Sequence, residues 1–422
     1  MTAALPDEHF FRRESGRLVA TLTRVLGVHH LALAEDAVQE TLAAAVEVWA
    51  FRGLPDNPSA WLMAAARNRA ISLLRRERTA RRFAPELGRS ADAEAPAEPR
   101  PQGHLPEALR DDELRMMFSC SHPDISEDAQ VALVLSLLCG FSAQEVAGAF
   151  LVSRAAMEKR LTRAKKVLSG STTLFELGAR DFHGRLAAVH RALYLLFNEG
   201  YHGACPDAVV RLDLCREAMR LVALLVAHAP AATPASHALA ALMALHAARL
   251  PARLDEAGDL TDLARQDRSR WDAGLIARGL ELLEASARGE VVSEYHLEAA
   301  IAATHALAPT AEQTPWGEIV ELYDALLRVR PSPVVALNRA VALAEHQGPA
   351  RGLEALGAMQ GSERLSGYPF YPAALGELEL RLGRATEARK HFRTAYRLAR
   401  NPAESRFLER RLAECEARLA PR

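Results

Sequence analysis

Apolar residues recur at three- and four-residue spacing along almost the whole chain of 422 residues, and no stretch alternates convincingly between apolar and polar residues. This spacing places the apolar side chains on one face of a helix, whereas a half-buried strand needs a period of two. Alanine, leucine, arginine and glutamate dominate the sequence, and all four are good helix formers. The sequence therefore predicts an all-α protein.

The helical pattern is interrupted most clearly between Arg82 and Pro106. Five prolines lie there among alanine, glutamate and glycine: Pro85, Pro96, Pro99, Pro101 and Pro106. Proline lacks a backbone N–H and cannot continue a helix, so we interpret residues 83–106 as a flexible linker. It separates a first helical module (residues 8–82) from a second (residues 107–169). A third region, residues 170–422, follows Ser169-Gly170-Ser171 and is expected to be helical to its end.

Composition argues against several classes of protein. Hydrophobic residues make up 49% of the chain, which does not fit wholesale disorder, yet there is no uninterrupted apolar run of about 18 residues to span a membrane. Asp7 and Glu8, without an apolar run beside them, do not fit a signal peptide, so we expect a cytoplasmic protein. The five cysteines are scattered and form no C-x-x-C pair: Cys120, Cys139, Cys205, Cys215 and Cys415. This fits a reducing compartment, and we expect no disulfide framework, no metal and no cofactor.

The first module contains an amphipathic helix followed by a basic one. The apolar stripe consists of Leu33, Ala37, Val38, Leu42, Val46 and Trp49, and the polar face of Glu35, Asp36, Gln39, Glu40 and Glu47. A loop from Phe51 to Pro58 follows, and Asn57-Pro58 predicts a helix start. That helix carries Arg67, Arg69, Arg75, Arg76, Arg78, Arg81 and Arg82 against Glu77. Basic side chains concentrated on one helix suit phosphate neutralisation, with an ordinary solvated face as the alternative.

The second module ends in a short helix, a tight turn and a longer basic helix, which is the layout of a helix-turn-helix. Ser142 and Glu145 predict a capping box for the short helix, and Ser153 a cap for the long one. The inward-facing residues are Val146, Ala147 and Phe150, then Met157, Leu161, Ala164 and Leu168. The outward-facing residues are Arg154, Lys159, Arg160, Arg163, Lys165 and Lys166. One such pattern is weak evidence, but two basic helical modules in this order are much more specific.

These residues resemble a known family. Glu35-Asp36-Ala37-Val38-Gln39-Glu40-Thr41, then Trp61-Leu62, Ala66-Arg67-Asn68 and Leu74-Arg75-Arg76, resembles region two of extracytoplasmic-function sigma factors of the sigma-70 family. The stretch from Gly140 to Leu168, with Ser153, Met157, Arg160-Leu161 and Arg163-Ala164-Lys165, resembles their region four. The resemblance covers about the first 170 residues, in the order and spacing of the family.

The resemblance implies a role for each matching position. Residues Glu35, Asp36, Gln39 and Glu40 would dock on core RNA polymerase. The loop from Arg52 to Asn57, with Trp61 and Asn68, would accept bases flipped out of the melted −10 element, which costs a few kcal/mol that stacking must recover. The backbone around those bases would be held by Arg67, Arg69, Arg75 and Arg76. The helix that would enter the major groove of the −35 element carries Ser153, Arg154, Glu158, Lys159, Arg160, Arg163, Lys165 and Lys166.

Four positions depart from the family pattern. Ser72 stands where Asp is usual, and Leu151 where the turn usually has Gly. Ala156 replaces a common Thr, and Arg154-Ala155 differs from the usual small pair. These departures leave the fold prediction intact, but they put the −35 sequence and its recognition residues in doubt.

The third region extends about 250 residues beyond the minimal members of the family. Ala336 to Gly348 compares with Ala374 to Gly383, and the two glycines are 35 residues apart, near the ~34-residue tetratricopeptide period. Further elements of such a repeat are Tyr323, Leu327 and Arg330-Pro331, then Glu387-Ala388, Phe392, Ala395 and Asn401-Pro402. We expect helix pairs stacked into a short solenoid whose concave face binds a regulatory protein, with a purely structural solenoid as the alternative.

A polar cluster lies in the first part of this region: His183, His190, Asn198, Glu199, Tyr201 and His202. The segment from His190 to His202 resembles a signature of extracytoplasmic-function sigma factors with tetratricopeptide-like extensions. One interpretation is a metal or catalytic site, because His and Glu are ligand types and Glu199 could act as a base. The favoured interpretation is a helix end, where Asn198 and Gly200 form the stop and Glu199 and Tyr201 tie the extension to the sigma modules.

The predicted function is therefore that of a sigma factor without catalytic activity, whose partners are core RNA polymerase and promoter DNA. The fused extension is expected to act as a built-in regulatory or interaction domain. The alternatives are a helix-turn-helix regulator or a tetratricopeptide scaffold that acts without polymerase, and an enzyme centred on residues 190–202. The first module argues against the regulator, since a repressor has no need of an acidic docking face ahead of its helix-turn-helix.

Overall fold

The computed structural model describes residues 6, 8–83, 106–150, 152–170, 179–202, 210–256 and 258–420. Nearly all of these residues lie in helices, and within them there is no β-strand, only one isolated antiparallel bridge between Leu254 and Leu260. The all-α prediction is confirmed. The predicted linker lies almost wholly outside the described residues, as does Leu151. The chain divides into two compact units, Met1–Leu196 and Phe197–Arg422, which we call unit 1 and unit 2.

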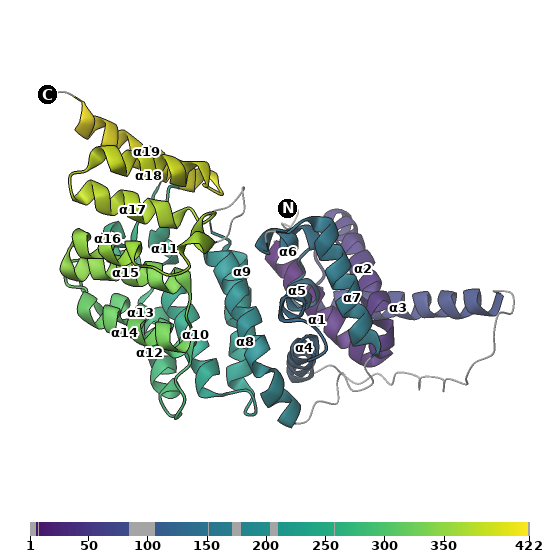
Figure 1. Cartoon of the computed structure of the whole chain (residues 1–422). Coiled ribbons are helices and arrows are strands. Elements are labelled where there is room, and N and C mark those ends of the chain that lie inside the picture. The colour runs from purple at the N-terminus through teal and green to yellow at the C-terminus, as the bar shows by residue number, and fades with distance from the viewer. Residues whose placement is uncertain are drawn as a thin grey trace. The chain divides into compact units, whose positions relative to one another are not determined.

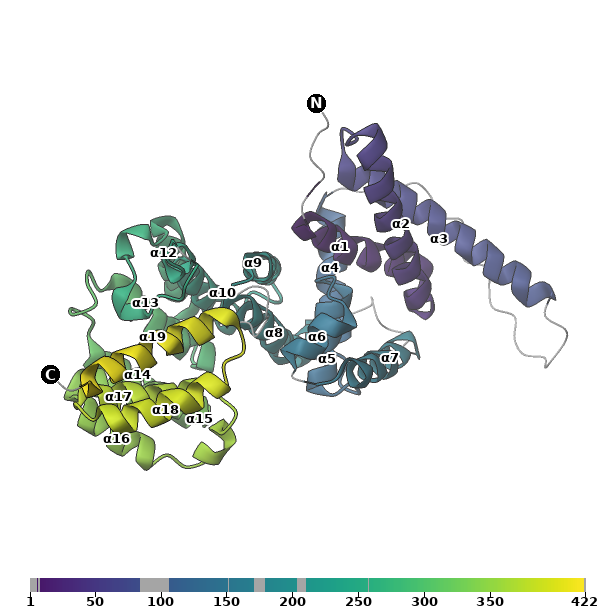
Figure 2. The ribbon, with the colours of Figure 1, turned by 90° about the horizontal axis from the view of Figure 1, so that it is seen from above.

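Unit 1 begins with three mutually packed helices. These are α1 (Glu8–Leu26), α2 (Leu31–Arg52), which a 3-10 turn (Val28–His30) precedes, and α3 (Pro58–Phe83). Asn57 caps α3 as predicted, because its Oδ1 accepts a hydrogen bond of 3.0 Å from the backbone N–H of Ala60. The far end of α3 extends past α2 (Figures 1 and 2).

The buried face of α2 differs from the predicted stripe. The buried residues are Leu31, Ala34, Ala37, Val38, Thr41, Ala45 and Trp49. Val46 is wrongly assigned to the stripe, since 44% of it is exposed, and Leu33 and Leu42 are only partly buried. The actual face is built from alanines, which let neighbouring helices approach closely, so hydrophobicity alone places the stripe about one residue off. The predicted loop also begins later, because α2 includes Phe51 and Arg52 and ends at Gly53, whose φ is 78°.

The helix-turn-helix forms as predicted in the second half of unit 1. The helices of this half are α4 (Pro106–Cys120), α5 (Glu127–Leu137), α6 (Ala143–Ala149) and α7 (Arg154–Gly170), and the helix-turn-helix consists of α6 and α7. Ser142 and Glu145 form the capping box of α6, and the Ser153 hydroxyl accepts from the Ala156 N–H at 3.3 Å. The inward residues Val146, Ala147, Met157, Leu161, Ala164 and Leu168 are all buried, and Phe150 is half-buried.

The two modules of unit 1 pack on each other through α1. The Cβ of any residue replacing Gly16 would lie 1.9 Å from the carbonyl oxygen of Leu138, so only glycine allows this close approach. Arg24 forms a 2.6 Å ion pair with the buried Asp112 of α4, and Arg12 forms one of 2.6 Å with Glu145 of α6. Burial acts to raise the pKa of Glu145, but hydrogen bonds from Arg12 and Ser142 outweigh it, so the pKa is lowered. Residues far apart in sequence thus form one unit.

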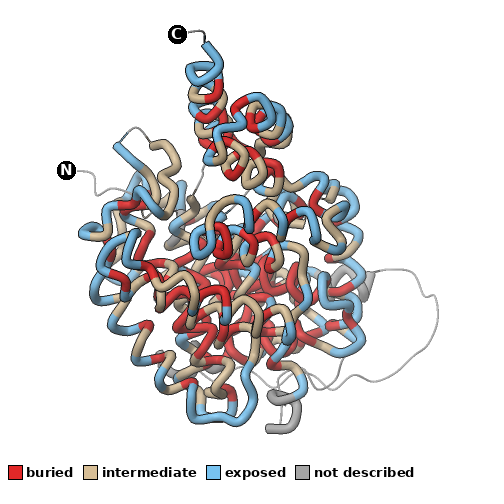
Figure 3. The backbone as a smooth tube through the Cα atoms, turned by 60° about the vertical axis from the view of Figure 1, so that its left-hand side comes forward, coloured by how far each residue is buried: buried red, intermediate tan, exposed pale blue. Residues whose placement is uncertain are grey.

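Helix α8 (Ala179–His202) contains the boundary between the units, and unit 2 continues with a succession of helices (Figure 1). These are α9 (Leu212–Ala227), α10 (Pro234–Ala247), α11 (Leu250–Arg253), α12 (Ala273–Ser286), α13 (Glu294–Leu307), α14 (Trp316–Val329), α15 (Pro333–Gln347), α16 (Pro349–Gly357), α17 (Phe370–Arg381), α18 (Ala385–Arg397) and α19 (Pro402–Leu419). Short 3-10 turns lie at Leu263–Arg265, Arg268–Arg270 and Ser362–Leu365. From α12 to α19 each helix packs on the next in the chain, and the buried residues lie along the facing sides (Figure 3).

The two glycines of the predicted repeat occupy equivalent places in unit 2. Gly348 directly follows α15 with φ 94°, and Gly383 follows α17 with φ 78°. Only glycine adopts such values without strain, so each marks the end of a helix. The three residues between α17 and α18 leave room only for a reversal of direction, which makes these two helices antiparallel neighbours. The helical extension was therefore predicted correctly as helices in succession.

No helix among the described residues is long and apolar enough to cross a bilayer.

Candidate nucleic-acid and protein interface

A cavity of about 330 Å³ between α2 and α3 brings several predicted site residues together. Its lining includes Glu40, Trp61, Asn68, Arg69 and Arg76. Glu40 and Arg69 form an ion pair of 2.9 Å in which both side chains remain about half exposed. The predicted −10 residues thus border the predicted polymerase-binding face at Glu40. Ser72, the departure from the family pattern, lines the same cavity and is exposed.

Trp61 is held in place by a cluster of aromatic rings. Its ring centroid lies 5.5 Å from that of Trp49, edge to face, and Phe11 stacks on Trp49 at 5.8 Å. Trp49 is buried while Trp61 is half-buried, so one part of the Trp61 ring remains open to the cavity. Packing against a buried ring fixes the orientation of Trp61 before anything binds, which lowers the entropic cost of stacking a base on it.

Phe51 is an exposed aromatic residue that the sequence analysis did not single out as a site. It is 93% exposed in the last turn of α2, beside the exposed Arg52. A large apolar ring exposed to this degree next to a cation is a platform on which a base can stack. The sequence places Phe51 in the predicted loop, which could have indicated its exposure. Only the structure shows that nothing covers its ring.

The arginines of α3 differ in exposure. Arg69, Arg75 and Arg76 are exposed, whereas Arg67 is half-buried. The side chains of Arg78, Arg81 and Arg82 lie outside those that the structure describes. The three exposed arginines lie on the solvent side of α3, and Arg67 lies nearer to the core of unit 1.

Helix α7 presents most of its predicted residues to solvent. Ser153, Arg154, Glu158, Lys159, Arg163 and Lys166 are exposed. Arg154 Nε binds Glu158 Oε1 at 2.7 Å, so the departure from the usual small residue supplies an ion pair on the helix surface. Arg160 does not point freely outward: it is half-buried, lies over the Phe150 ring at 5.7 Å and approaches Asp128 to 3.6 Å. Its guanidinium fastens α7 to α5 and to the end of α6.

Lys165 and Glu35 join two predicted sites to each other. Lys165 Nζ lies 2.6 Å from Glu35 Oε1, and the two side chains are 28% and 21% exposed. Burial raises the pKa of Glu35, which the attraction of Lys165 opposes. A second contact nearby is the 2.7 Å hydrogen bond between His29 Nδ1 and the carbonyl oxygen of Ser169. In this arrangement neither Glu35 nor Lys165 is available to a partner, whereas Asp36 and Gln39 remain exposed.

The segment from His190 to His202 is part of one helix, so the prediction that Asn198 and Gly200 stop it is wrong. The Cβ of an alanine at 200 would lie 2.8 Å from the Arg211 carbonyl oxygen and from the Cys215 amide nitrogen. Gly200 thus serves a close crossing with the start of α9. His190 is buried, and burial lowers its pKa to about 4. Among the described residues no group of three His, Cys, Asp or Glu is placed to hold a metal ion.

Comparison with known families gives three matches. Residues 10–94 match sigma-70 region 2, residues 115–168 match sigma-70 region 4, and residues 185–287 match a family of unknown function (DUF6596). A relative from Rhizobium meliloti (strain 1021), named "Uncharacterized protein R00370", is 42% identical over 389 residues, which cover 91% of this chain and 90% of the relative. The similarity therefore extends through both units.

Proposed function

The chain belongs to the sigma-70 family, and on that premise we propose that it is a sigma factor of the extracytoplasmic-function type that directs core RNA polymerase to specific promoters in the cytoplasm. The observation that carries the proposal is the combination in one unit of an aromatic and cationic cavity on α3 with an exposed basic recognition helix α7. We also propose that the chain catalyses no reaction of its own.

The cavity on α3 is the proposed site for flipped bases of the −10 element. Trp61 offers a pre-oriented ring face and Phe51 an exposed one, and each stacked base is worth about 1–3 kcal/mol. The exposed Arg69, Arg75 and Arg76 would hold the phosphates on either side. Stacking at two rings is of the right size to recover the few kcal/mol needed to unstack the bases.

The proposed −35 contacts divide along α7. Ser153, Arg154 and Glu158 lie in its first turns, where side chains reach base edges, and Lys159, Arg163 and Lys166 would lie along the phosphates. Because Arg154 is paired with Glu158, base recognition would exchange that ion pair for contacts with the DNA. Arg160 is proposed to position the helix on α5 more than to contact the DNA.

Asp36, Gln39 and Glu40 support polymerase docking from the exposed face of α2. Glu35 belongs to the same face, but its carboxylate is engaged by Lys165. Full use of both surfaces therefore requires that this pair be exchanged for contacts with polymerase and DNA. The extension in unit 2, proposed to be tetratricopeptide-like, is a candidate for a regulatory protein to bind, which its succession of packed helices supports.

The test is run-off transcription with purified core RNA polymerase and promoter DNA from upstream of the gene for this protein. The full chain should support a specific transcript, and Asp36→Arg should abolish it by repelling the docking surface. Glu47→Arg is the matched control, since Glu47 is equally exposed on α2 outside the proposed docking set. No transcript with the full chain, together with operator binding in the absence of polymerase, would establish a helix-turn-helix regulator instead.

A further inference from the structure

Three arginines in unit 2 are at least partly withdrawn from solvent and form no ion pair with a carboxylate within the described residues. They are Arg249, which precedes α11, Arg253, which ends it, and Arg268 in the 3-10 turn at Arg268–Arg270. Within the described part of the chain, none of the three forms an ion pair with an Asp or Glu, and their polar contacts are to neutral groups. A buried guanidinium without a counter-charge is costly, so each such group requires an explanation.

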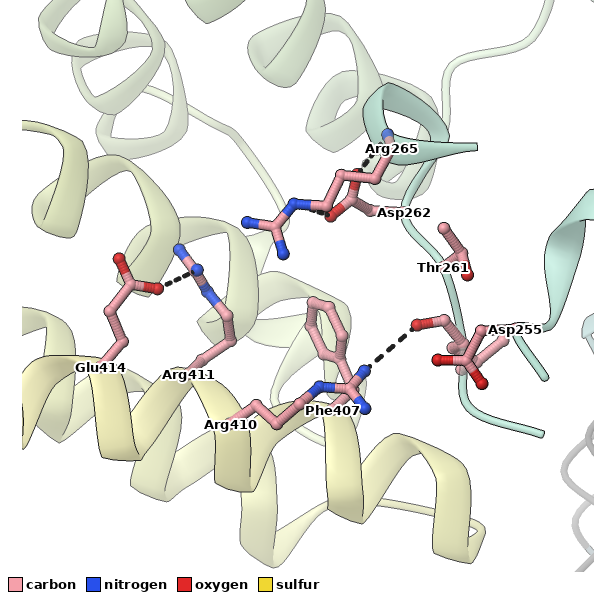
Figure 4. Close-up of a pocket in the computed structure, with 9 residues that line it drawn as sticks. Asp255, Thr261, Asp262, Arg265, Phe407, Arg410, Arg411 and Glu414 are labelled. Atoms are coloured by element: carbon pink, nitrogen blue, oxygen red, sulfur yellow. Dashed lines mark hydrogen bonds and ion pairs between the residues drawn. The ribbon is translucent and has the colours of Figure 1, made fainter. Parts of the chain in front are cut away.

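A cleft of about 310 Å³ elsewhere in unit 2 shows the usual arrangement (Figure 4). Arg265, Arg410 and Arg411 line it, and each is neutralised by a carboxylate of the same region: Asp262 at 3.5 Å, Asp259, and Glu414 with Glu377. Each arginine that lines this cleft thus has a carboxylate partner within the protein. By contrast, Arg249, Arg253 and Arg268 form no ion pair among the residues described, although the charge of Glu312 acts on Arg268.

Of the three, Arg268 is explained by its own contacts. Its Nη1 donates to the carbonyl oxygens of His305 at 2.7 Å and Ala308 at 2.5 Å, and its guanidinium lies 4.8 Å from the Trp271 ring. These bonds connect the 3-10 turn to the end of α13, so Arg268 has a structural role.

Arg249 and Arg253 are not explained in this way. Arg249 makes one long hydrogen bond of 3.4 Å to Gln266 and lies 5.5 Å from the ring of Trp271, although it is only 9% exposed. Arg253 lies 4.1 Å over the Tyr201 ring and contacts His202 Nδ1 at 3.1 Å, while its buried Nε has no hydrogen-bond partner. This leaves Arg249 and Arg253, which are four residues apart in the sequence and whose guanidinium N–H donors are not all used in hydrogen bonds.

Tyr201 and His202 contact Arg253, His246 lies beside Tyr201, and the charge of Arg249 acts on both histidines; we call these five residues the arginine cluster. His202 is exposed, yet burial and the charge of Arg253 hold its pKa well below the usual value, so protein atoms surround a side chain that solvent still contacts. Burial, together with Arg249 and Arg253, also lowers the pKa of the half-buried His246 to about 3. Both histidines are therefore neutral at pH 7, and the charge of the arginine cluster comes from the guanidiniums.

Other polar atoms of the arginine cluster lack hydrogen-bond partners as well. Tyr201 Oη and His246 Nδ1 are buried and form no hydrogen bond. Leaving such an atom unsatisfied costs about 1–3 kcal/mol, which a bound acceptor would recover. Two carboxylates of this region are Glu199, on which the charges of Arg211 and Arg400 act, and Glu298, which acts on Tyr323. Neither forms an ion pair with Arg249 or Arg253.

We propose that the arginine cluster of Arg249, Arg253, His202, His246 and Tyr201 is a binding site for a small oxyanion, the phosphate or carboxylate group of a ligand. The planar guanidinium matches such groups with paired N–H donors, and two of them one turn apart can hold the same anion. Tyr201 supplies a hydroxyl donor, and neutral histidines can each donate one N–H. The site lies wholly within unit 2, so the inference does not depend on the sigma-factor proposal.

The test is isothermal titration calorimetry of the full chain with inorganic phosphate and, separately, with malonate, against chloride at equal ionic strength. We expect saturable binding with a Kd of about 1 mM or tighter for at least one of the two anions. Binding of phosphate alone assigns a phosphoryl ligand, binding of malonate alone a carboxylate ligand, and binding of both a general oxyanion site. Absence of saturable binding for both anions overturns the proposal.

Variants locate the site. Arg253→Gln should weaken binding at least about tenfold, and Arg253→Lys, which keeps the charge but loses the paired donors, should also weaken it. Arg278→Gln is the matched control, because it removes the same charge from an exposed position of α12. If Arg253→Gln does not fold, Arg249→Gln serves the same purpose. Equal affinity in the Arg253→Gln, Arg249→Gln and Arg278→Gln proteins would show that the anion binds elsewhere and overturn the assignment.

Discussion

The two units use arginine in opposite ways. In unit 1, Arg76 and Arg163 project from helix surfaces into solvent, where their charge is available to a polyanion. In unit 2, Arg249 is buried and Arg268 is half-buried, and both lie over the ring of Trp271. An exposed arginine contributes to binding and little to stability, whereas a buried one is part of the packing and hydrogen bonding of its unit. Substitution of an exposed arginine of unit 1 should therefore weaken binding, whereas substitution of Arg249 or Arg268 in unit 2 should lower stability.

The largest effect is expected at Arg268. Arg268→Met keeps the hydrophobic stem but leaves the carbonyl oxygens of His305 and Ala308 without their donor, which should lower the free energy of unfolding by about 3 kcal/mol. Urea unfolding followed by tryptophan fluorescence measures this change. Arg265→Met, three residues away and 72% exposed, is the control and should change stability by about 0.5 kcal/mol or less. Equal losses at the two sites would contradict the distinction between buried and exposed arginines.

His305, which lies near Arg249 and Arg268, contributes a pH dependence to the stability of unit 2. Burial, and then the charges of Arg249 and Arg268, lower its pKa to about 4 in the folded chain, against 6.5 in the unfolded chain. The unfolded chain therefore binds the proton first, and the stability due to neutral His305 is present above pH 6.5 and lost as pH falls toward 4. Between pH 7 and pH 5 this amounts to on the order of 2 kcal/mol.

His305→Gln should flatten the pH dependence by that amount, whatever it does to stability at neutral pH. Urea unfolding at pH 7, 6 and 5 compares the slopes of the two proteins. An unchanged slope in the variant would mean that His305 does not remain neutral in the folded chain.

Two glycines of α8, one in each unit, should respond with opposite sign to the same substitution. Gly200→Ala forces a Cβ to 2.8 Å from backbone atoms of Arg211 and Cys215 and should cost about 2 kcal/mol. Gly184→Ala meets nothing within 4 Å and should stabilise the helix by up to about 1 kcal/mol. Thermal unfolding of both variants checks the pair. A stabilised Gly200→Ala protein would show that α8 and the start of α9 are less tightly packed than described.

The exposed cations of α7 should affect DNA binding without affecting folding. Arg163→Gln combined with Lys166→Gln should weaken promoter binding by the complex with core polymerase about tenfold, and reduce the salt dependence by about two ions. Arg278→Gln combined with Lys390→Gln removes the same charge from exposed sites of unit 2 and should leave binding unchanged. Filter binding across a range of salt concentrations measures both. An equal loss of promoter affinity in the two double variants would show that the effect comes from net charge and not from the position of the cations on α7.

The difference between the units also explains what the sequence could and could not predict. Helices, the capping boxes and the exposed basic faces depend on local patterns, so the Ser142–Glu145 box and the solvent-facing side of α7 were predicted from the residues alone. The arginine cluster of unit 2 depends on residues from α8, α10 and α11 that meet only in the folded chain. Local patterns give no signal for such a group, because its members are not spaced along one helix.

The errors have the same origin. Val46 was assigned to the core because valine is hydrophobic, whereas α2 packs through alanines that a hydrophobicity pattern underweights. Gly200 was expected to end α8, because glycine disfavours helices, but the close approach of Cys215 requires it inside the helix. In both cases a tertiary contact decides the role of a residue that local propensity assigns otherwise.

The smallest effect is expected at the ion pair that joins the two proposed interfaces of unit 1. A double-mutant cycle with Glu35→Gln and Lys165→Gln should give a coupling energy of about 0.5–1 kcal/mol, because the pair is partly shielded from solvent. The matched pair Arg154 and Glu158 is 65% and 48% exposed on one helix and should give about 0.3 kcal/mol. A coupling this weak holds α2 and α7 together in the free protein, yet contacts with polymerase and DNA can replace it. The same cycle repeated in the complex with core polymerase should therefore show no coupling, and a coupling that persists there would mean that Glu35 and Lys165 remain paired during promoter binding.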